Sequence, residues 1–494
     1  MCSSYDVPEI VDAEARHRVR QSFNDVLAGI RLNQVCRAHT DRRRAREHQL
    51  QNVLRVRHAA HAHDGDVHRL IHLIDHAHGQ REHAGTGHTA GLVCQQRAAA
   101  RKVGPCSKLN VALVGVGGIG AFAVGSLINY KYANIVALCD VDDARAAKQY
   151  SRFPAWLPKF RDYRVMLDQM DKQIDAVIIS TPDHMHYPIA AWAIAKGKHV
   201  FCQKPLTRTI WEAEELKRLA KKAGVITQMG NQGHTNEGWR LIKEWYDAGI
   251  LGQIEDIYVW TNRPVWPQGD LKMPAGQPVP STLDYDLWLG VAPYQPYNNA
   301  VVPFKWRGLR NYGTGAAGDM ACHFLDVPYS AFDLGFPMKV VGNSTPFNDY
   351  SWPKEASSVM TFMNKRGVDN RIRLHWYDGG RKPKEIKRVD PAFLADPRNN
   401  NATFIVGTKE TVYTNEYGQN TRIWPATRMK ELMKGGKLPE KTIPRSVTPG
   451  NPFQEWVLAC LDGKQPTANF DYAAPFTEIF GFCRICLQGR CGFD

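Results

Sequence analysis

The sequence predicts an α/β protein in which a doubly wound parallel sheet is followed by an α+β domain with a mostly antiparallel open sheet. Three observations favour this fold class. A glycine-rich turn follows an apolar run, strand and helix patterns alternate up to about residue 229, and turn-bounded strands dominate afterwards. We therefore expect the parallel sheet within 108–229 and the second domain within 230–479.

The first predicted strand, 109–114, runs into a turn that fits the pattern G-x-G-x-x-G. In this pattern the first glycine permits a tight turn, the second lets backbone approach a pyrophosphate, and the last allows close helix–strand packing. The residues expected to meet a dinucleotide are Gly115, Gly117, Gly118, Ile119 and Gly120. A lone match is weak, because many loops contain glycines.

A second predicted strand strengthens this interpretation, since it ends at Asp140, twenty residues after Gly120. A carboxylate at this place can accept hydrogen bonds from an adenosine ribose and would repel a 2′-phosphate. The spacing predicts an NAD(P)-binding Rossmann domain with NAD preferred to NADP. The alternative is an ordinary acidic residue at a strand end.

Two further strands, 174–180 and 198–202, end in loops that should lie at the same edge of the sheet. The first loop begins Thr181-Pro182 and contains His186, although a surface turn would explain it equally. In the second, Pro205 restricts Lys204 to extended geometry, which would place its amine beside the nicotinamide. A solvated surface lysine is the alternative.

A helical pattern later in the chain carries Asp319 and His323, four residues apart and so on one face. A carboxylate beside an imidazole can orient the ring and raise its basicity, as proton removal from a hydroxyl requires. Taken alone, the pair is more often structural.

Together, the glycine turn, Thr181-Pro182 with His186, and Lys204-Pro205 resemble the glucose-fructose oxidoreductase, inositol dehydrogenase and rhizopine-catabolism family, written Gfo/Idh/MocA. The resemblance covers about 108–478. It implies a catalytic lysine at Lys204, and it implies catalytic roles for Asp319 and His323. The family commonly has glutamate where this chain has Gln203, which marks a Gln-Lys-Pro subtype.

The resemblance and the predicted loops together define the remaining candidate contacts. Beyond the glycine turn and Asp140, those for the cofactor are Thr181, Pro182, His186, Gln203, Lys204, Asn231, Trp306 and Arg307. Those for the substrate are Gln232, His234, Arg263 and Trp266, since aromatic faces with nearby polar groups suit a sugar ring. Trp288 is expected in the core, and no metal site is predicted.

The function predicted from this set is an NAD-dependent oxidoreductase acting on a carbohydrate or polyol hydroxyl. His323 would remove the proton with help from Asp319, and Lys204, its pKa lowered by burial or by the cofactor ring, would stabilise the developing oxygen charge. Two alternatives stay open. One is an NAD-dependent glycosidase using transient sugar oxidation and elimination, and the other is a non-catalytic dinucleotide-binding protein.

The two ends of the chain differ in composition from the body. Residues 1–107 hold 12 of the 18 histidines but no tryptophan, which predicts a disordered or non-native head rather than a metal site, although His68, His72 and His76 would share a helical face. Residues 480–494 form an atypical tail. Its pattern C-x2-C-x4-C lacks a fourth zinc ligand, so truncation or a frame change is favoured.

Charge and hydropathy limit the partners. The net charge of +14 is spread along the chain without basic blocks interleaved with aromatics, so nucleic-acid binding is not expected. No apolar run approaches the roughly 18 to 20 residues of a membrane span. We expect a small sugar or glycoside substrate and a homo-oligomer formed through the second-domain sheet. Without a recognisable signal, localisation is open between the cytoplasm and the bacterial periplasm.

Overall fold

A computed structural model of the chain describes residues 107–486, with side chains up to residue 481. The predictions made for the histidine-rich head and for the tail cysteines therefore lie outside the described residues or side chains. The tail prediction overlaps one element, because helix α16 (Phe470–Cys486) continues past residue 480. Among the described residues, no helix is both long and apolar enough to cross a membrane.

The first domain is a six-stranded sheet in which all neighbouring strands are parallel, as predicted. Its strands, in the spatial order β3-β2-β1-β4-β5-β6, are β3 (Lys159–Phe160), β2 (Ala133–Cys139), β1 (Leu109–Val114), β4 (Ala176–Ile179), β5 (His199–Gln203) and β6 (Thr227–Gly230). The chain order reverses direction beside β1, which is where ligands bind in such sheets.

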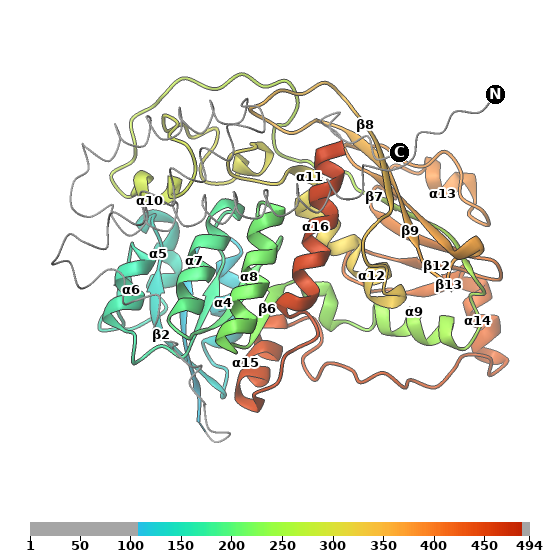
Figure 1. Cartoon of the computed structure of the whole chain (residues 1–494), viewed down its shortest axis with the longest axis horizontal. Coiled ribbons are helices and arrows are strands. Elements are labelled where there is room, and N and C mark those ends of the chain that lie inside the picture. Colours follow the sequence, from blue (N-terminus) through green and yellow to red (C-terminus); the bar gives the residue numbers. More distant parts are fainter. Residues whose placement is uncertain (1–106, 487–494) are drawn as a thin grey trace, which may run out of the picture. The chain divides into compact units, whose positions relative to one another are not determined.

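Helices cover both faces of this sheet because alternate strand residues point to opposite sides. Ala112 and Val114 face one core, together with α6 (Tyr163–Gln169), α7 (Asp183–Ala195) and α8 (Ile210–Ala223). Leu109, Val111 and Leu113 face the other, with α4 (Gly120–Leu127) and α5 (Asp143–Tyr150). Helices α7 and α8 lie side by side (Figure 1).

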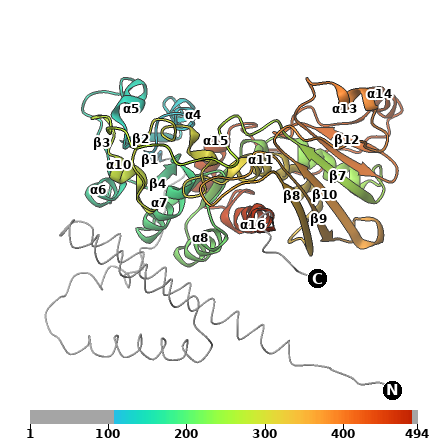
Figure 2. The same ribbon diagram turned by 90° about the horizontal axis from the view of Figure 1, so that it is seen from above.

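The second domain is a seven-stranded sheet in which only β7 and β10 run parallel to each other. Its order is β13 (Arg422–Trp424), β12 (Thr411–Thr414), β11 (Ala402–Gly407), β7 (Ile254–Trp260), β10 (Arg371–Tyr377), β9 (Ala356–Met363) and β8 (Lys339–Ser344). Figure 2 shows most of these strands side by side. The mostly antiparallel open sheet agrees with the predicted fold class.

Two C-terminal helices return from the second sheet to the first domain. Helix α15 (Pro452–Asp462) packs its Phe453 and Trp456 rings against Phe201 of β5, with ring centroids 4.6 and 5.8 Å apart. Helix α16 contacts both α8 and β8 (Figure 2). Residues 452–462, which the sequence division places in the second domain, thus complete a core of the first.

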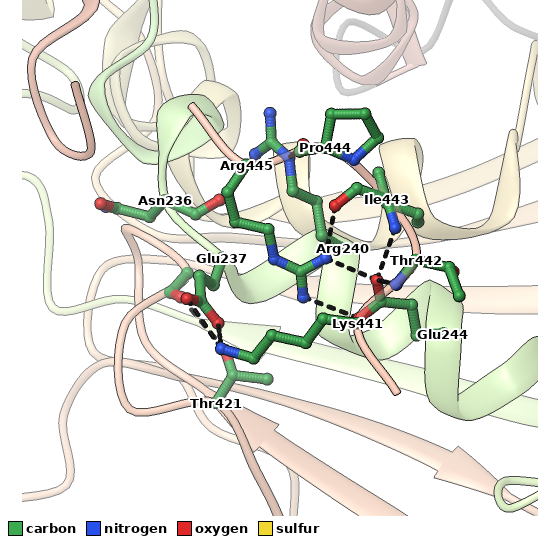
Figure 3. A network of polar contacts seen from close by, with 11 residues as sticks. Asn236, Glu237, Arg240, Glu244, Thr421, Lys441, Thr442, Ile443, Pro444 and Arg445 are labelled. Carbon is green, nitrogen blue, oxygen red and sulfur yellow. Dashed lines mark hydrogen bonds and ion pairs between the residues drawn. The ribbon is translucent and has the colours of Figure 1, made fainter. Parts of the chain in front are cut away.

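The segment before α15 is fixed to α9 (Gly238–Asp247) by the polar network of Figure 3. The Arg445 guanidinium forms a two-pronged ion pair with Glu244, with N–O distances of 2.5 and 2.7 Å. Lys441 forms a second pair with Glu237 at 2.8 Å, but both of these side chains are largely exposed. The network fixes the irregular segment that leads into α15, which packs against β5.

A long segment between β7 and α11 (Gly315–Phe324), residues 261–314, has its own small core and lies against the first domain. It contains α10 (Tyr285–Leu289) and the short helix η2 (Lys305–Gly308). The Asp143 N–H donates to Thr282 O (3.0 Å) and the Asp284 N–H donates to Val141 O (2.9 Å). This segment, which we call the strap, therefore bonds to the chain immediately after β2.

Candidate active site

A cavity of about 480 Å³ opens at the carboxyl ends of β1, β2, β4 and β5. Its walls come from the strand-end loops of the first domain, the strap, helix α11 and the turn between β12 and β13. Because parallel strands present their loops at one edge, motifs that are distant in sequence meet here.

The glycine turn forms the floor of one end of the cavity. Gly115 and Gly118 adopt positive φ angles of 79° and 54°, and a Cβ on Gly115 would lie 2.7 Å from Ser180 O. Gly120 does not line the cavity, but a Cβ there would clash with Gly115 O. Gly117, Gly118 and Ile119 line it directly. The bare backbone beside a helix N-terminus fits a pyrophosphate.

Asp140, at the end of β2, lines the same part of the cavity and braces the glycine turn. Its carboxylate accepts hydrogen bonds from the N–H groups of Val116 (2.9 Å) and Gly117 (3.2 Å) and from that of Asp142 (3.1 Å). Burial raises the pKa of Asp140, and these backbone donors counteract the rise. The residue thus has a structural role in the turn besides any contact with a ribose.

Lys204 and Asp319 form an ion pair between the first domain and helix α11. Lys204 Nζ lies 3.0 Å from Asp319 Oδ1 and also donates to Asp319 O at 3.0 Å. The guanidinium of Arg307 approaches the same carboxylate, at 3.5 Å from Nε, and is stacked on the ring of Trp306. Two cations therefore share one carboxylate at the cavity wall.

This pair corrects the expected pKa of the lysine. Burial disfavours the charged amine, but the charge and hydrogen bond of the Asp319 carboxylate, together with the Cys322 thiol, act against burial, so the pKa of Lys204 is raised rather than lowered. Burial likewise opposes the charge on Asp319, yet the Lys204 and Arg307 cations keep the pKa of Asp319 below its usual value. Lys204 is thus a charged donor at neutral pH.

His323 lies one helical turn beyond Asp319 and lines the cavity. Burial, with a smaller contribution from the Lys204 cation, lowers the pKa of His323 to about 3, so the ring is neutral at pH 7. The expected orientation of the ring by Asp319 needs correction, because the carboxylate is directed to Lys204 instead. The neutral ring retains a lone pair for accepting a proton.

Besides Gly120, three predicted contacts lie outside the cavity lining. The ring nitrogens of His186 lie 2.8 and 2.9 Å from the carbonyl oxygens of Pro205 and Thr181, so His186 joins two strand-end loops. Asn231 donates to Cys322 O (2.7 Å), and His234 Nδ1 lies 2.8 Å from Asp326 Oδ1. These side chains form hydrogen bonds to neighbouring segments and so help to fix the loops and helices that surround the cavity.

Five buried polar atoms of the cavity residues have no hydrogen-bond partner within the described part of the chain. They are Ser180 Oγ, Thr181 Oγ1, Gln203 Nε2, Gln232 Oε1 and His323 Nδ1. Leaving a buried polar atom unpaired costs about 1–3 kcal/mol. Their concentration in one cavity therefore indicates a polar ligand that supplies the missing bonds.

The second domain contributes the opposite wall. Arg263, Trp266, Trp306 and Arg307 line it, and so does Gln232. The Trp266 indole N–H donates to Gln268 Oε1 at 2.7 Å, and Trp266 lines the cavity. Trp288 belongs to the core of the strap, as expected, and also reaches the cavity lining. Pro182 lines the site beside Thr181.

Several lining residues were not predicted. Asp183 is buried and accepts a hydrogen bond from Thr314 Oγ1 at 2.7 Å, while Arg145 lies over the glycine turn. Glu416 and Tyr417 enter from the turn between β12 and β13. Asp183 follows the Thr181-Pro182 motif directly and could have been found by that position. The turn residues gave no sequence signal.

Comparison with known proteins agrees with this geometry. The chain matches the family described as "Oxidoreductase family, NAD-binding Rossmann fold" over residues 109–231, and its companion "Oxidoreductase family, C-terminal alpha/beta domain" over 246–348. The fold therefore defines a two-domain protein whose first domain matches the NAD-binding Rossmann domain of this oxidoreductase family. The chain belongs to the Gfo/Idh/MocA family, as its motifs predicted.

Among curated relatives, inositol 2-dehydrogenase of Salmonella typhimurium is 29% identical over 147 residues, which cover 29% of this chain and 43% of the relative. The scyllo-inositol 2-dehydrogenase (NADP(+)) of Bacillus subtilis is 28% identical over 173 residues, covering 35% and 38%. The matched segments thus span less than half of these relatives.

Solved structures share the fold at lower identity. The WlbA dehydrogenase from Bordetella pertussis, in complex with NADH and UDP-GlcNAcA, has a TM-score of 0.53 at 17% identity, covering 78% of this chain and 98% of that one. Levoglucosan dehydrogenase, in complex with NADH and levoglucosan, has a TM-score of 0.52 at 18% identity, with the same coverage.

Proposed function

We propose that this chain is an NAD-dependent oxidoreductase that oxidises a hydroxyl group of a carbohydrate or polyol. The observation that carries the proposal is one cavity that joins the glycine turn, the Lys204–Asp319 pair and five unpartnered polar atoms. The nicotinamide dinucleotide, when bound, supplies the two-electron acceptor.

The site residues divide the remaining chemistry. His323, neutral at pH 7, accepts the proton of the substrate hydroxyl. Lys204, charged because Asp319 faces it, donates a hydrogen bond to the oxygen as negative charge develops there. Asp319 positions Lys204 and raises its pKa, which keeps the amine charged. The Arg307 cation acts in the opposite direction and lowers the pKa of Lys204.

The cofactor preference is proposed to be NAD. Asp140 places a carboxylate beside the glycine turn, where it would repel a 2′-phosphate. The opposite preference occurs among relatives, since the Bacillus subtilis protein is named as NADP(+)-dependent. Titration of the full chain with NADH and NADPH, followed by quenching of tryptophan fluorescence, tests the preference. Equal affinities, or tighter NADPH binding, would contradict it.

The substrate class follows from the second-domain wall and from the names of relatives. Trp266 offers a ring face, and Gln232 and Arg263 offer an acceptor and donors for hydroxyl groups. Relatives and structural neighbours are named for inositols and levoglucosan. We therefore expect a cyclic polyhydroxylated substrate.

The test is reduction of NAD⁺ by the full chain with myo-inositol, scyllo-inositol and levoglucosan supplied separately. The expected result is stoichiometric formation of reduced cofactor, seen at its absorbance band, with at least one of them. Binding of NADH without reduction by any of the three would contradict the proposed substrate class. Cleavage of an aryl glycoside without net reduction would instead favour the glycosidase.

We also propose that the chain forms a homo-oligomer through the second-domain sheet. Strand β8 is an edge strand, and exposed apolar side chains gather on it and on the chain next to it, namely Met338, Val341 and Met363. Unpaired edge strands with apolar residues favour association. Light scattering after size-exclusion chromatography tests this proposal, and a monomer at high concentration would contradict it. Val341→Lys is expected to dissociate the oligomer.

A further inference from the structure

The turn between β12 and β13, residues 415–421, reaches from the edge of the second sheet into the cavity. Glu416 and Tyr417 of this turn line the cavity on the side of His323. Nothing in the fold of the sheet requires the turn to be there, since β12 and β13 pair by themselves. Its position at the site is therefore a feature to be explained.

The backbone of the turn is held tightly in this position. Asn236 donates from Nδ2 to Tyr417 O at 2.9 Å, and Asn415 Oδ1 accepts from the Tyr417 N–H at 3.1 Å. Gly233 permits the close approach, because a Cβ there would lie 3.0 Å from Tyr417 Cα. At Gly238 a Cβ would lie 2.6 Å from the Cα of Gly418.

These contacts fix where the Tyr417 side chain enters the cavity. Its ring stands edge-on to the ring of His323, with centroids 5.2 Å apart and planes at 71°. Its hydroxyl lies within electrostatic reach of Lys204 and Asp319. Burial raises the pKa of Tyr417, so the phenol keeps its proton at neutral pH and is a hydrogen-bond donor.

The hydroxyl of Tyr417 has no hydrogen bond to another residue within 107–481, although its backbone groups are fully engaged. The hydroxyl is not one of the unpartnered polar atoms that are fully buried, and Tyr417 lines the cavity. The Tyr417 phenol lies beside the neutral His323 ring and near the charged Lys204. Its unused O–H donor can therefore form a hydrogen bond to an oxygen atom of a ligand in the cavity.

We propose that Tyr417 is a further catalytic residue, whose hydroxyl donates a hydrogen bond to the substrate oxygen that loses its proton to His323. The inference rests on the proposed function. It adds a residue from the second sheet to those that come from the parallel sheet and from α11. Lys204 and Tyr417 would then approach the same oxygen from the two domains, so only a substrate seated between the domains is activated.

The balance of the step is simple. The substrate C–H bond would break, and the oxidised dinucleotide, when bound, would be the acceptor of its hydrogen and both electrons. The O–H bond breaks, its proton goes to His323, and the carbon–oxygen bond becomes a carbonyl. Tyr417 keeps its own proton throughout and stabilises the charge on oxygen. Removing one donor of this kind typically costs about 10²- to 10³-fold in rate.

The experiment compares Tyr417→Phe with Tyr413→Phe in the full chain. Tyr413 lies in the same hairpin, but its ring packs with Phe404 and Trp424 outside the cavity. Both variants keep the ring and lose one hydroxyl. Three measurements are made with whichever of the inositols or levoglucosan the parent chain oxidises: kcat/KM, the Kd of NADH, and binding of the sugar to the NADH complex by saturation-transfer NMR.

For Tyr417→Phe, we expect kcat/KM to fall about 10²-fold or more, weaker sugar binding, and an NADH Kd within about twofold of the parent. For Tyr413→Phe all three should stay unchanged. Parent-like turnover and sugar binding in Tyr417→Phe would overturn the inference and leave the proposed function intact. Failure of the parent chain to reduce NAD⁺ with any of these sugars would overturn the proposed function, and the role of Tyr417 with it.

Discussion

Lys204 Nζ and Asp319 Oδ1 lie 3.0 Å apart although 115 residues separate them in the chain. One belongs to the end of a parallel strand and the other to helix α11, so the ion pair ties the two halves of the site together. Because both side chains are mostly buried, the pair is poorly screened by solvent. The charged state of Lys204 therefore depends on Asp319 in α11, which reaches it only when the chain is folded, and not on the residues of its own loop.

Replacing Lys204 with alanine should nearly abolish oxidation while sparing dinucleotide binding. The glycine turn that would bind the pyrophosphate is untouched, but the charged donor to the reacting oxygen is lost, which costs about 10²- to 10⁴-fold in kcat. Steady-state kinetics and NADH titration check both halves of this expectation. Lys198→Ala is the matched control, because this buried lysine precedes β5, pairs with Asp171 and does not line the cavity.

The buried neutral ring of His323 predicts a loss of stability in acid. Its pKa is about 3 in the folded chain and about 6.5 when unfolded, so the unfolded state takes up a proton first as pH falls below 6.5. At pH 5 this difference amounts to roughly 2 kcal/mol. The group's contribution is fully present above the unfolded pKa and falls until the folded pKa is reached.

His323→Gln should therefore lose less stability than the parent chain between pH 7.5 and pH 5. Denaturant unfolding at the two pH values measures this, and the comparison is between the two pH-dependent losses rather than between absolute stabilities. Equal losses in both chains would mean that the pKa of His323 is not lowered by folding.

Gly120→Ala should weaken NADH binding about tenfold or more, equivalent to about 1.4 kcal/mol. The added Cβ would meet Gly115 O, so the glycine turn must open. Gly125→Ala provides the control in the same helix, because nothing lies within 4 Å of its Cβ. We expect that control to bind NADH normally and to gain about 0.5–1 kcal/mol of stability. Fluorescence titration separates the two, and similar affinities would count against the turn as a dinucleotide site.

Arg445→Met should destabilise the chain by about 3–5 kcal/mol, because the buried carboxylate of Glu244 loses its two-pronged partner (Figure 3). Lys441→Met removes a largely exposed pair in the same network and should cost about 0–1 kcal/mol. Thermal unfolding of the two variants makes the comparison. A larger effect at Lys441 would show that the buried pair is not the anchor of this segment.

Sequence reasoning predicted the parallel sheet and its site because the relevant signals are local. A glycine turn after an apolar strand, an acid at the next strand end, and a proline after Lys204 each depend on a few neighbouring residues. The i,i+4 spacing likewise placed Asp319 and His323 on one helix. Spacing alone does not reveal which distant cation pairs with the Asp319 carboxylate. The Lys204–Asp319 ion pair and the raised pKa of Lys204 were therefore not predicted.

The remaining errors have the same origin. His186 lies in the first turn of α7, and Asn231 and His234 lie at and in a short 3-10 helix, residues 232–235. Their side chains are directed to backbone carbonyls, or to the Asp326 carboxylate in the case of His234, instead of the cavity. Tyr417 lies in an ordinary turn of the second sheet, and only the tertiary packing against Gly233 brings it to the site. Side-chain direction and long-range packing are therefore the parts that one sequence does not reveal.

The return of helix α15 to the parallel sheet has a practical consequence for dissecting this protein. A fragment that stops after β6 would leave the Phe201 side of the sheet bare, since Phe453 and Trp456 cover it from the far end of the chain. Such a fragment should aggregate when expressed. Supplying 452–462 through a short artificial linker is the way to obtain the nucleotide half in soluble form.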